Sequence, residues 1–501
     1  MAIERARSLS RAPRAREAPA PSWRPLLEGK AAAAAANAVT ELACALWNGA
    51  ETVAAGPSRS PQGTIRSVEH PSLDGLAGIS LLLVYLDRAL RAHRGEALEA
   101  LAATPSTLDL NGDWGERGRS VLDRAIRGSA AIGNFPPALF DGFVGVAWLI
   151  EHLANLDLAE GKERKEGQEE ERGGVAQRGA ALGGSEGAGE ADDAGETIAG
   201  ILRQYLGQTP WVRDFDLVSG LSGCGVYALE RLPRQGGEDC LRQVVARLAE
   251  TAERREGGAT WLTPACLLPQ HQRDIYPAGN YNLGVAHGVP GAIGVLAGAW
   301  EMGVERPRTF ELLAGAVRWL SAQKLPRGTG SVYPYAVPPG VEAKVPGVAW
   351  CYGDLGIAVC LLAAARRAGI AAWEQEAIAL ARQAATRRPA RSGRQDACLC
   401  HGAAGNGHLF NRLYQATGEP SFAAAARWWF GRALALRRQG TGLAGFSYRV
   451  ADDRGEPTLF PAPGFLDGAA GTGLALLAAI TSVPPEWDRL LLVSFPAGSF
   501  S

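Results

Sequence analysis

Apolar stretches of helical length recur along the chain, and a short glycine-containing phrase precedes each of them. Segments such as Gly356–Arg366 and Gly473–Ile480 are rich in Ala and Leu on all sides, and we expect such helices to be buried. More amphipathic stretches alternate with them, for example Trp373–Arg387 and Phe422–Arg438, and these can face solvent on one side. The alternation predicts helical hairpins that each combine a buried inner helix with a partly exposed outer helix.

A Gly-x-x-Gly sequence begins each apolar stretch and occurs seven times, at intervals of 49 to 78 residues. Such a recurrence defines an internal repeat. It predicts an all-α fold, an α/α toroid (double α-barrel) of seven helical-hairpin repeats with Gly-x-x-Gly at the inner-helix starts. Small residues there let crowded helix ends approach one another and bring backbone N–H groups near a ligand. The first glycines are Gly75, Gly142, Gly220, Gly288, Gly353, Gly402 and Gly468.

The residue before each first glycine is predicted to point towards the central cavity. In a purely structural toroid this position would hold helix N-cap residues, and Asp and Ser suit that role. Histidine and tyrosine do not, nor do the cysteines that precede two of them, so the pattern indicates chemistry at this rim. The seven positions are Asp74, Asp141, Ser219, His287, Tyr352, His401 and Asp467.

A metal site is predicted where Cys351 of the fifth repeat meets Cys400 and His401 of the sixth. A catalytic zinc takes three protein ligands and keeps a fourth position open. The alternative is two buried thiols and a capping histidine. Three such residues at equivalent points of neighbouring repeats favour one Zn²⁺ per chain. Cys398 is a competing thiol, but the register places Cys400 level with Cys351, and Cys360 further along the helix reads as an ordinary buried thiol.

Three further residues are candidate catalytic groups. His287 occupies the same repeat position as His401, which favours a general acid or base across the same cavity. Asp216 lies four residues before its repeat glycine and is a candidate to orient His287 or a substrate. A loop or capping role, with Asp214 as a competitor, is the alternative for this aspartate. Tyr352 is a candidate to donate a hydrogen bond to a developing oxyanion.

Composition limits the class of protein. The chain has 501 residues, a formal net charge of -1 and 47% hydrophobic residues, so it can bury a large core and lacks the basic footprint of nucleic-acid binding. Its eight cysteines, without a secretory signal, do not indicate a disulfide framework. No transmembrane segment is predicted. We expect an Arg/Ala/Pro-rich disordered tail at 1–30 and a single toroid domain over 31–501, with a disordered Gly/Glu/Ala-rich insertion at about 158–197.

The phrases "NLGVAHGVPG", "AWCYGDLG" and "CLCHGAAG" on seven Gly-x-x-Gly units closely resemble the lanthionine synthetase C-like (LanC) cyclases over about residues 70–480. The resemblance implies a zinc-dependent lanthionine synthetase, in which peptide cysteine thiols add to dehydroalanine or dehydrobutyrine to form thioether rings. The substrate thiol would take the fourth zinc position. By resemblance the zinc ligands are Cys351, Cys400 and His401, and the catalytic positions are His287, Asp216 and Tyr352.

The resemblance also implies a dehydrated precursor peptide as substrate, with a lanthipeptide dehydratase and an exporter as candidate partners. It implies a cytoplasmic protein, with a partner complex as a route to peripheral membrane association. There is one departure from the family pattern. Cyclases of this family often carry Arg four residues before the zinc cysteine, and here that position is Gly347, with Lys344 as the nearest cation. The departure bears on how the charge of Asp216 is balanced.

Two alternative functions remain open. A LanC-like protein that adds glutathione or another small thiol to dehydrated proteins would carry the same motifs. A non-catalytic, zinc-containing peptide-binding scaffold is opposed by three ligands with no obvious fourth, because structural zinc sites are closed. Zinc-dependent protein prenyltransferases and terpene cyclases have related shapes, but they use an aspartate ligand or aspartate-rich motifs that do not fit this sequence.

Overall fold

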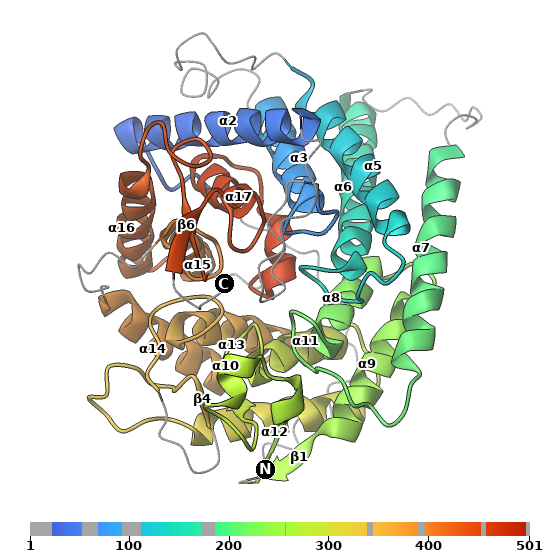
Figure 1. Ribbon diagram of the computed structural model, residues 1–501, viewed down its shortest axis with the longest axis vertical. Coiled ribbons are helices and arrows are strands. Elements are labelled where there is room, and N and C mark those ends of the chain that lie inside the picture. The colour runs from blue at the N-terminus through green and yellow to red at the C-terminus, as the bar shows by residue number, and fades with distance from the viewer. Residues whose placement is uncertain are drawn as a thin grey trace.

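A computed structural model describes residues 23–52, 69–92, 112–171, 186–255, 257–337, 344–387, 396–451 and 457–496. Their long helices form two concentric rings around a common centre (Figure 1). The inner helices are α3 (Leu76–Ala92), α6 (Phe143–Glu171), α8 (Leu221–Arg231), α11 (Val289–Glu301), α13 (Asp354–Ala368), α15 (Ala403–Thr417) and α17 (Ala469–Ile480). The outer helices are α2 (Gly29–Thr52), α5 (Trp114–Ala131), α7 (Glu186–Leu206), α9 (Gly237–Thr251), α12 (Arg306–Ala322), α14 (Ala371–Thr386) and α16 (Pro420–Leu436).

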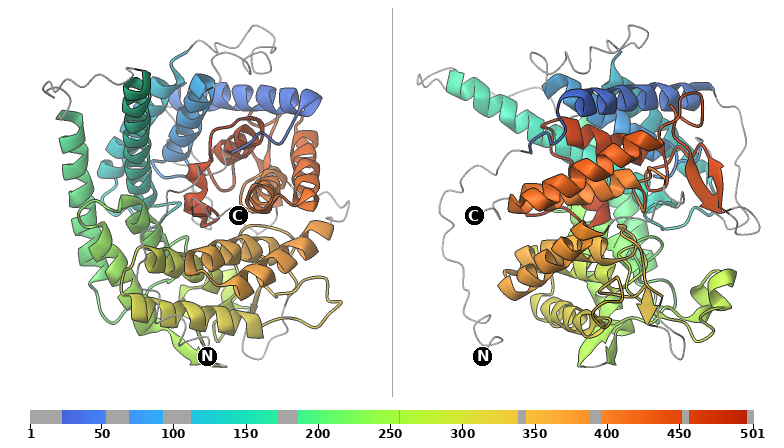
Figure 2. Two further views of the ribbon diagram at one scale, coloured as in Figure 1. Left: turned by 180° about the vertical axis from the view of Figure 1, so that it is seen from behind. Right: turned by 90° about the vertical axis from the view of Figure 1, so that its left-hand side faces the viewer.

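The inner ring is closed. Each inner helix packs against its inner neighbours, and α17 returns to pack against α3. The inner helices from α3 to α15 each pair with the outer helix that follows in the chain, whereas α17 pairs with α2 at the start. The view from behind shows the same two rings (Figure 2). This arrangement confirms the predicted α/α toroid.

Burial along the helices follows from their composition. In α17 every residue except the last is buried, as an apolar helix in the inner ring requires. In α9 the buried side chains form a single stripe that includes Leu241, Val244 and Leu248, and the remaining positions face solvent or are partly exposed. No helix among the described residues combines the length and apolarity needed to cross a membrane.

The second glycine of each Gly-x-x-Gly lets an inner helix begin directly above the loop that leads into it. A Cβ atom at Gly405 would overlap the carbonyl oxygen of Leu399, and one at Gly471 would overlap that of Phe465. In all seven copies the overlapping atom is the carbonyl oxygen five or six residues earlier in the chain. Any side chain would therefore push the loop away from its helix, which explains why the repeat keeps glycine here.

Backbone hydrogen bonds join the loops that precede the inner helices into a belt around the centre. Each bond runs from an N–H group of one loop to a carbonyl oxygen of the next, with lengths of 2.9 to 3.3 Å. The belt fixes each inner-helix start relative to at least one neighbour, and among the described residues it joins every adjacent pair of loops except those before α11 and α13. The donor–acceptor pairs are Asp74–Phe140, Leu139–Val218, Leu217–Ala286, Trp350–Cys400, Leu399–Leu466 and Phe465–Leu73.

Short antiparallel strand pairs lie on the rings. Hairpins pair β1 (Glu253–Arg255) with β2 (Gly258–Thr260) and β5 (Tyr448–Ala451) with β6 (Pro457–Phe460), whereas β3 (Tyr281–Asn282) pairs with β4 (Ala336–Val337) although α11 and α12 lie between them in the chain. Asn282 is opposite Ala336 in the β3–β4 register. One-turn helices occur at α10 (Gln270–Arg273) and Ala265–Leu267, and a longer 3₁₀ segment at Glu486–Leu491.

The predicted disordered tail, residues 1–30, includes residues that the structure shows to be ordered and packed. Trp23, Leu26 and Leu27 are buried, and the N–H groups of Leu26 and Leu27 both donate to the carbonyl oxygen of Ala479 at the end of α17. These apolar side chains pack because α2 and α17 offer a surface that the local composition does not reveal. Residues 1–22 lie outside the described part of the chain.

The predicted disordered insertion is helical at both of its described ends. Helix α6 continues to Glu171 and α7 begins at Glu186, so both run into the stretch predicted at 158–197. Residues 158–171 are rich in Glu and also contain Lys and Arg, and these residues favour helices. Residues 172–185 lie outside the described ranges.

Replacing the second glycine of a repeat should destabilise the ring. We expect Gly471→Ala to lower the free energy of unfolding by about 1–3 kcal/mol, because the added methyl group overlaps the Phe465 carbonyl oxygen. Gly431→Ala in α16 is the matched control, since a Cβ atom there meets nothing within 4 Å and the change should be neutral or stabilising. Urea unfolding measures both, and equal stabilities would contradict the role given to the repeat glycines.

Candidate metal centre and catalytic site

The residue before the first glycine keeps solvent access in all seven repeats, while the glycine after it is buried. For α8, α11, α13, α15 and α17 the helix N-cap is the glycine itself and carries no side-chain hydrogen bond. The preceding side chains therefore do not cap these five helices. They are left free to meet a ligand at the opening of the ring.

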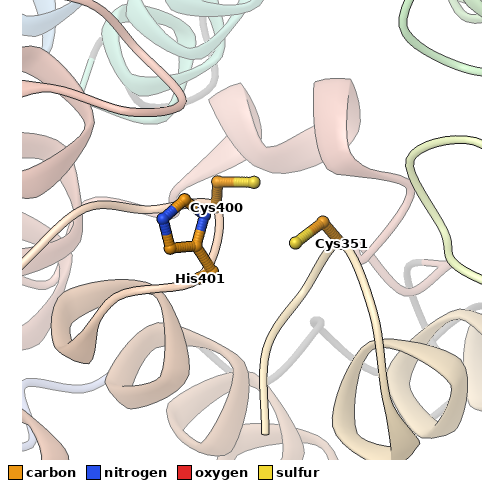
Figure 3. A group of neighbouring side chains, drawn as sticks. All are labelled: Cys351, Cys400 and His401. Carbon is orange, nitrogen blue, oxygen red and sulfur yellow. The ribbon is translucent and has the colours of Figure 1, made fainter. Parts of the chain in front are cut away.

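Cys351, Cys400 and His401 form a compact cluster, with one ligand atom of each within 4.8 Å of the others. Figure 3 shows the two sulfur atoms and the imidazole ring side by side, on loops that lead into α13 and α15. The belt holds the loops together, because the N–H group of Trp350 donates to the carbonyl oxygen of Cys400 at 3.1 Å. The three residues predicted to bind a metal are thus brought together.

The electrostatics of the cluster favour one thiolate. The hydrogen bond with Cys400 and the neighbouring His401 together lower the pKa of Cys351 to about 6 despite its burial. The same pairing raises the pKa of Cys400, so the two thiols share a proton. Both loops end at helix N-termini, whose partial positive charge also favours thiolate. Two sulfur atoms and one imidazole nitrogen are a donor set that suits zinc, and the His401 side chain, 46% exposed, leaves one side open.

A second group of possible ligands, Asp396, Cys398 and His401, lies beside the first. Its donors already hold the loop in shape. The Asp396 carboxylate accepts hydrogen bonds from the N–H groups of Cys398 and Arg449, both at 2.9 Å, and the Cys398 sulfur accepts from the N–H group of His401 at 3.5 Å. Asp396 and Cys398 are also buried. We therefore favour Cys351 over Cys398 as the partner of His401.

His287 and Asp216 form a close ion pair on the loops that lead into α11 and α8. The His287 Nδ1 atom is 2.5 Å from Oδ2 of Asp216, and Oδ1 of Asp216 accepts a hydrogen bond from the N–H group of Ser219 at 2.7 Å. Burial opposes protonation of His287, but the charge and hydrogen bond of Asp216 outweigh it and raise the histidine pKa. The side chain remains 43% exposed, so its Nε2 edge is available to a ligand.

Tyr352 lies close to the histidine, with ring centroids 6.5 Å apart. Its hydroxyl oxygen accepts a hydrogen bond from the Asn282 side-chain amide at 2.9 Å, which leaves the phenol hydrogen free to be donated. Burial raises the pKa of Tyr352, so the phenol keeps its hydrogen at neutral pH. The Asn282 amide is fixed in turn, because its oxygen accepts from the N–H group of Gly284 at 2.8 Å.

Further carboxylates surround His287. Burial and the nearby Asp216 raise the pKa of Asp214 to about 6, and burial also raises the pKa of Asp141. Both shifts make these carboxyl groups easier to protonate, and a protonated carboxyl group carries no negative charge. A Cβ atom at Gly347, where the family often has an arginine, would meet nothing within 4 Å. The loop therefore has room for a side chain that this sequence does not carry.

Three residues of the site were not proposed from the sequence. Asp467 places Oδ1 3.6 Å from Nδ1 of His401, and its repeat position, equivalent to that of His401, was the available signal. Asn282 holds the Tyr352 hydroxyl, and Tyr335 packs on the Tyr352 ring with a centroid distance of 4.9 Å. Neither of the latter occupies a repeated position, so the sequence offered no signal for them.

A family model described as "Lanthionine synthetase C-like protein" matches residues 69–492. The chain belongs to this family. Among solved structures, nisin cyclase shares the fold of this LanC-like protein, with a TM-score of 0.62 and 18% sequence identity over 85% of this chain and 93% of that chain. None of the curated proteins compared with the sequence matches it.

The His287 pKa in this LanC-like protein should depend on Asp216. We expect Asp216→Asn to lower the pKa, measured by NMR titration of the ring, because the variant removes the charge that favours the imidazolium. Asp214→Asn is the matched control and should have a smaller effect, since the hydrogen bond comes from Asp216. Equal shifts in the two variants would contradict the pairing.

The raised pKa also sets the sign of a stability effect. The folded state holds the His287 proton more tightly than the unfolded chain does, so the pair stabilises the fold fully below about pH 6.5, the ordinary histidine pKa. This contribution is lost as the pH rises through the raised folded-state value.

Proposed function

We propose that the chain is a zinc-dependent lanthipeptide cyclase that adds peptide cysteine thiols to dehydroalanine or dehydrobutyrine and so closes thioether rings. The observation that carries the proposal is the cluster of Cys351, Cys400 and His401 within 4.8 Å in a member of the LanC-like family. The His287–Asp216 pair on other loops of the same belt adds a proton donor.

Cys351, Cys400 and His401 would hold the zinc ion. When bound, zinc lowers the pKa of a substrate thiol, so that thiolate is available at neutral pH. Three protein ligands from two loops leave one position for the substrate, as in catalytic zinc sites. The partly exposed His401 supports this, because a closed structural site would have its ligands covered.

His287 supplies the proton that completes the addition. The substrate sulfur forms a bond to the β-carbon of the dehydro residue, and the π electrons move towards the carbonyl oxygen. Asp216 occupies Nδ1 of His287, so the proton leaves from Nε2 and is transferred to the α-carbon. The neutral imidazole then recovers the proton released by the substrate thiol, and Asp216 favours its return. Tyr352 is placed to donate a hydrogen bond to the oxygen while it carries charge.

The substrate is a peptide that already contains a dehydro residue, since the groups assigned here catalyse addition to a double bond. A dehydration reaction must therefore come first, and a lanthipeptide dehydratase is the class of enzyme that would supply the peptide. The carbon–sulfur bond forms without an oxidant or reductant.

Metal analysis tests the ligand set. We expect purified protein to hold about one zinc per chain, and Cys351→Ala and Cys400→Ala to lose it, because two donors bind the ion far more weakly than three. Cys398→Ala is the matched control and should keep the metal, since its thiol is buried against the loop. Retention in the Cys351 and Cys400 variants, with loss in the Cys398 variant, would move the site to Asp396 and Cys398.

Incubation with a dehydrated, cysteine-containing peptide tests the reaction. Ring closure consumes the free thiol without changing the peptide mass, so alkylation should stop while the mass stays constant. His287→Asn should lower the rate about 10²- to 10⁴-fold, the range for a lost general acid. With glutathione present, a mass gain of one glutathione would indicate small-thiol addition instead. If the peptide thiol still reacts with the alkylating reagent and the peptide mass is unchanged, no addition has occurred. That result would support the non-catalytic peptide-binding scaffold.

A further inference from the structure

The paired strands β3 and β4 lie directly on the segment that carries the metal cluster. A Cβ atom at Gly284, just after β3, would touch the Cys351 carbonyl oxygen and the Tyr352 ring. The N–H group of Leu283 donates to the carbonyl oxygen of Tyr335 at 3.0 Å, which fixes Tyr335 immediately before β4. The strand pairing thereby places a second tyrosine beside the site.

The Tyr335 side chain leans over Tyr352. The two ring centroids are 4.9 Å apart and the ring planes are tilted by 56°. Burial and the neighbouring Cys351 raise the pKa of Tyr335 and His401 lowers it, which is consistent with a phenol within electrostatic reach of both cluster residues. The phenol therefore keeps its hydrogen at neutral pH, and the residue is only partly buried.

Other nearby phenols differ in their hydroxyl partners. The Tyr352 hydroxyl accepts from Asn282 at 2.9 Å, and the Tyr333 hydroxyl donates to the Glu376 carboxylate at 3.1 Å. The Tyr335 hydroxyl makes no hydrogen bond within the described ranges of the chain. A phenol that is partly exposed beside a reactive cluster, with its donor unused, is available to a substrate.

The reaction requires such a donor close to the cluster. The β-carbon of the dehydro residue must reach the substrate sulfur, and its carbonyl oxygen is only two bonds beyond the α-carbon. That oxygen carries the developing negative charge until His287 protonates the α-carbon. Sites that stabilise such charge commonly present more than one hydrogen-bond donor to a single oxygen.

We propose that Tyr335 donates a hydrogen bond to the carbonyl oxygen of the dehydro residue as negative charge develops there, alongside Tyr352. The proposal rests on the proposed cyclase function. Tyr335 keeps its proton throughout. The carbon–sulfur bond forms, the carbon–carbon π electrons pass to the oxygen, and the carbonyl bond is restored when the α-carbon takes the proton from His287.

The test compares Tyr335→Phe with wild type in ring closure of a dehydrated peptide. We expect kcat to fall about 10²-fold, the usual effect of losing one oxyanion donor. Affinity for an unreactive peptide, with alanine at the dehydro position, should stay unchanged because its carbonyl develops no charge. Tyr333→Phe is the matched control: it removes a phenol from the same loop, and its kcat should equal that of wild type. Zinc content and melting temperature, measured on each variant, show whether the site remains intact.

Each other outcome is decisive. A Tyr335→Phe kcat within twofold of wild type overturns the proposal, as does a loss of kcat/KM explained entirely by weaker binding of the unreactive peptide. An equal fall of kcat in Tyr333→Phe would show that the loop, and not the Tyr335 hydroxyl, matters. These results leave the cyclase function standing. A wild-type protein that holds zinc but closes no ring contradicts the proposed function itself, and the assignment of Tyr335 falls with it.

Discussion

The belt of backbone hydrogen bonds between neighbouring loops is the constraint on which the rest of the structure depends. Backbone groups at the crowded centre of two helical rings need partners, and these loops satisfy one another. The belt can form only where each helix start lies against its own loop, and that approach excludes a Cβ atom at the second glycine. Seven copies of one local geometry therefore set the inner ring, its closure and the direction of the side chains at its opening.

The belt positions two groups of candidate catalytic residues, each on a pair of neighbouring loops. Neighbouring loops before α13 and α15 bring two thiols and an imidazole together, and a belt hydrogen bond joins those same loops. Loops before α8 and α11 bring a histidine and an aspartate together in the same way. Reactive groups far apart in sequence thus become neighbours through the same loop geometry that builds the ring. Buried histidines inside the helices α6 and α15 are used differently: His152 bonds to Glu230 and His408 to Asp488, which ties distant segments together.

The sequence was sufficient for features that repeat. Helix starts, the ring and the grouping of Cys351 with Cys400 and His401 all follow from positions counted relative to a glycine. The sequence was insufficient where the position of a residue depends on a segment outside the repeats. Tyr335 reaches the site through the pairing of β3 with β4, two segments that lie far apart in the chain and carry no periodic signal, and only folding shows that its ring meets Tyr352. The charged stretch after residue 158 misled because high charge suggests disorder, whereas its Glu, Lys and Ala residues also favour helix.

The central claim is that two cysteines and one histidine hold a zinc ion with a position left for a substrate thiol. X-ray absorption spectroscopy at the zinc edge tests it most directly, because sulfur and nitrogen neighbours are distinguished by distance, about 2.3 Å against about 2.0 Å. The predicted result is two sulfur neighbours in the protein alone and three after addition of a cysteine-containing peptide. A sulfur count that the peptide leaves unchanged, or a zinc ion with four protein ligands, would contradict the claim.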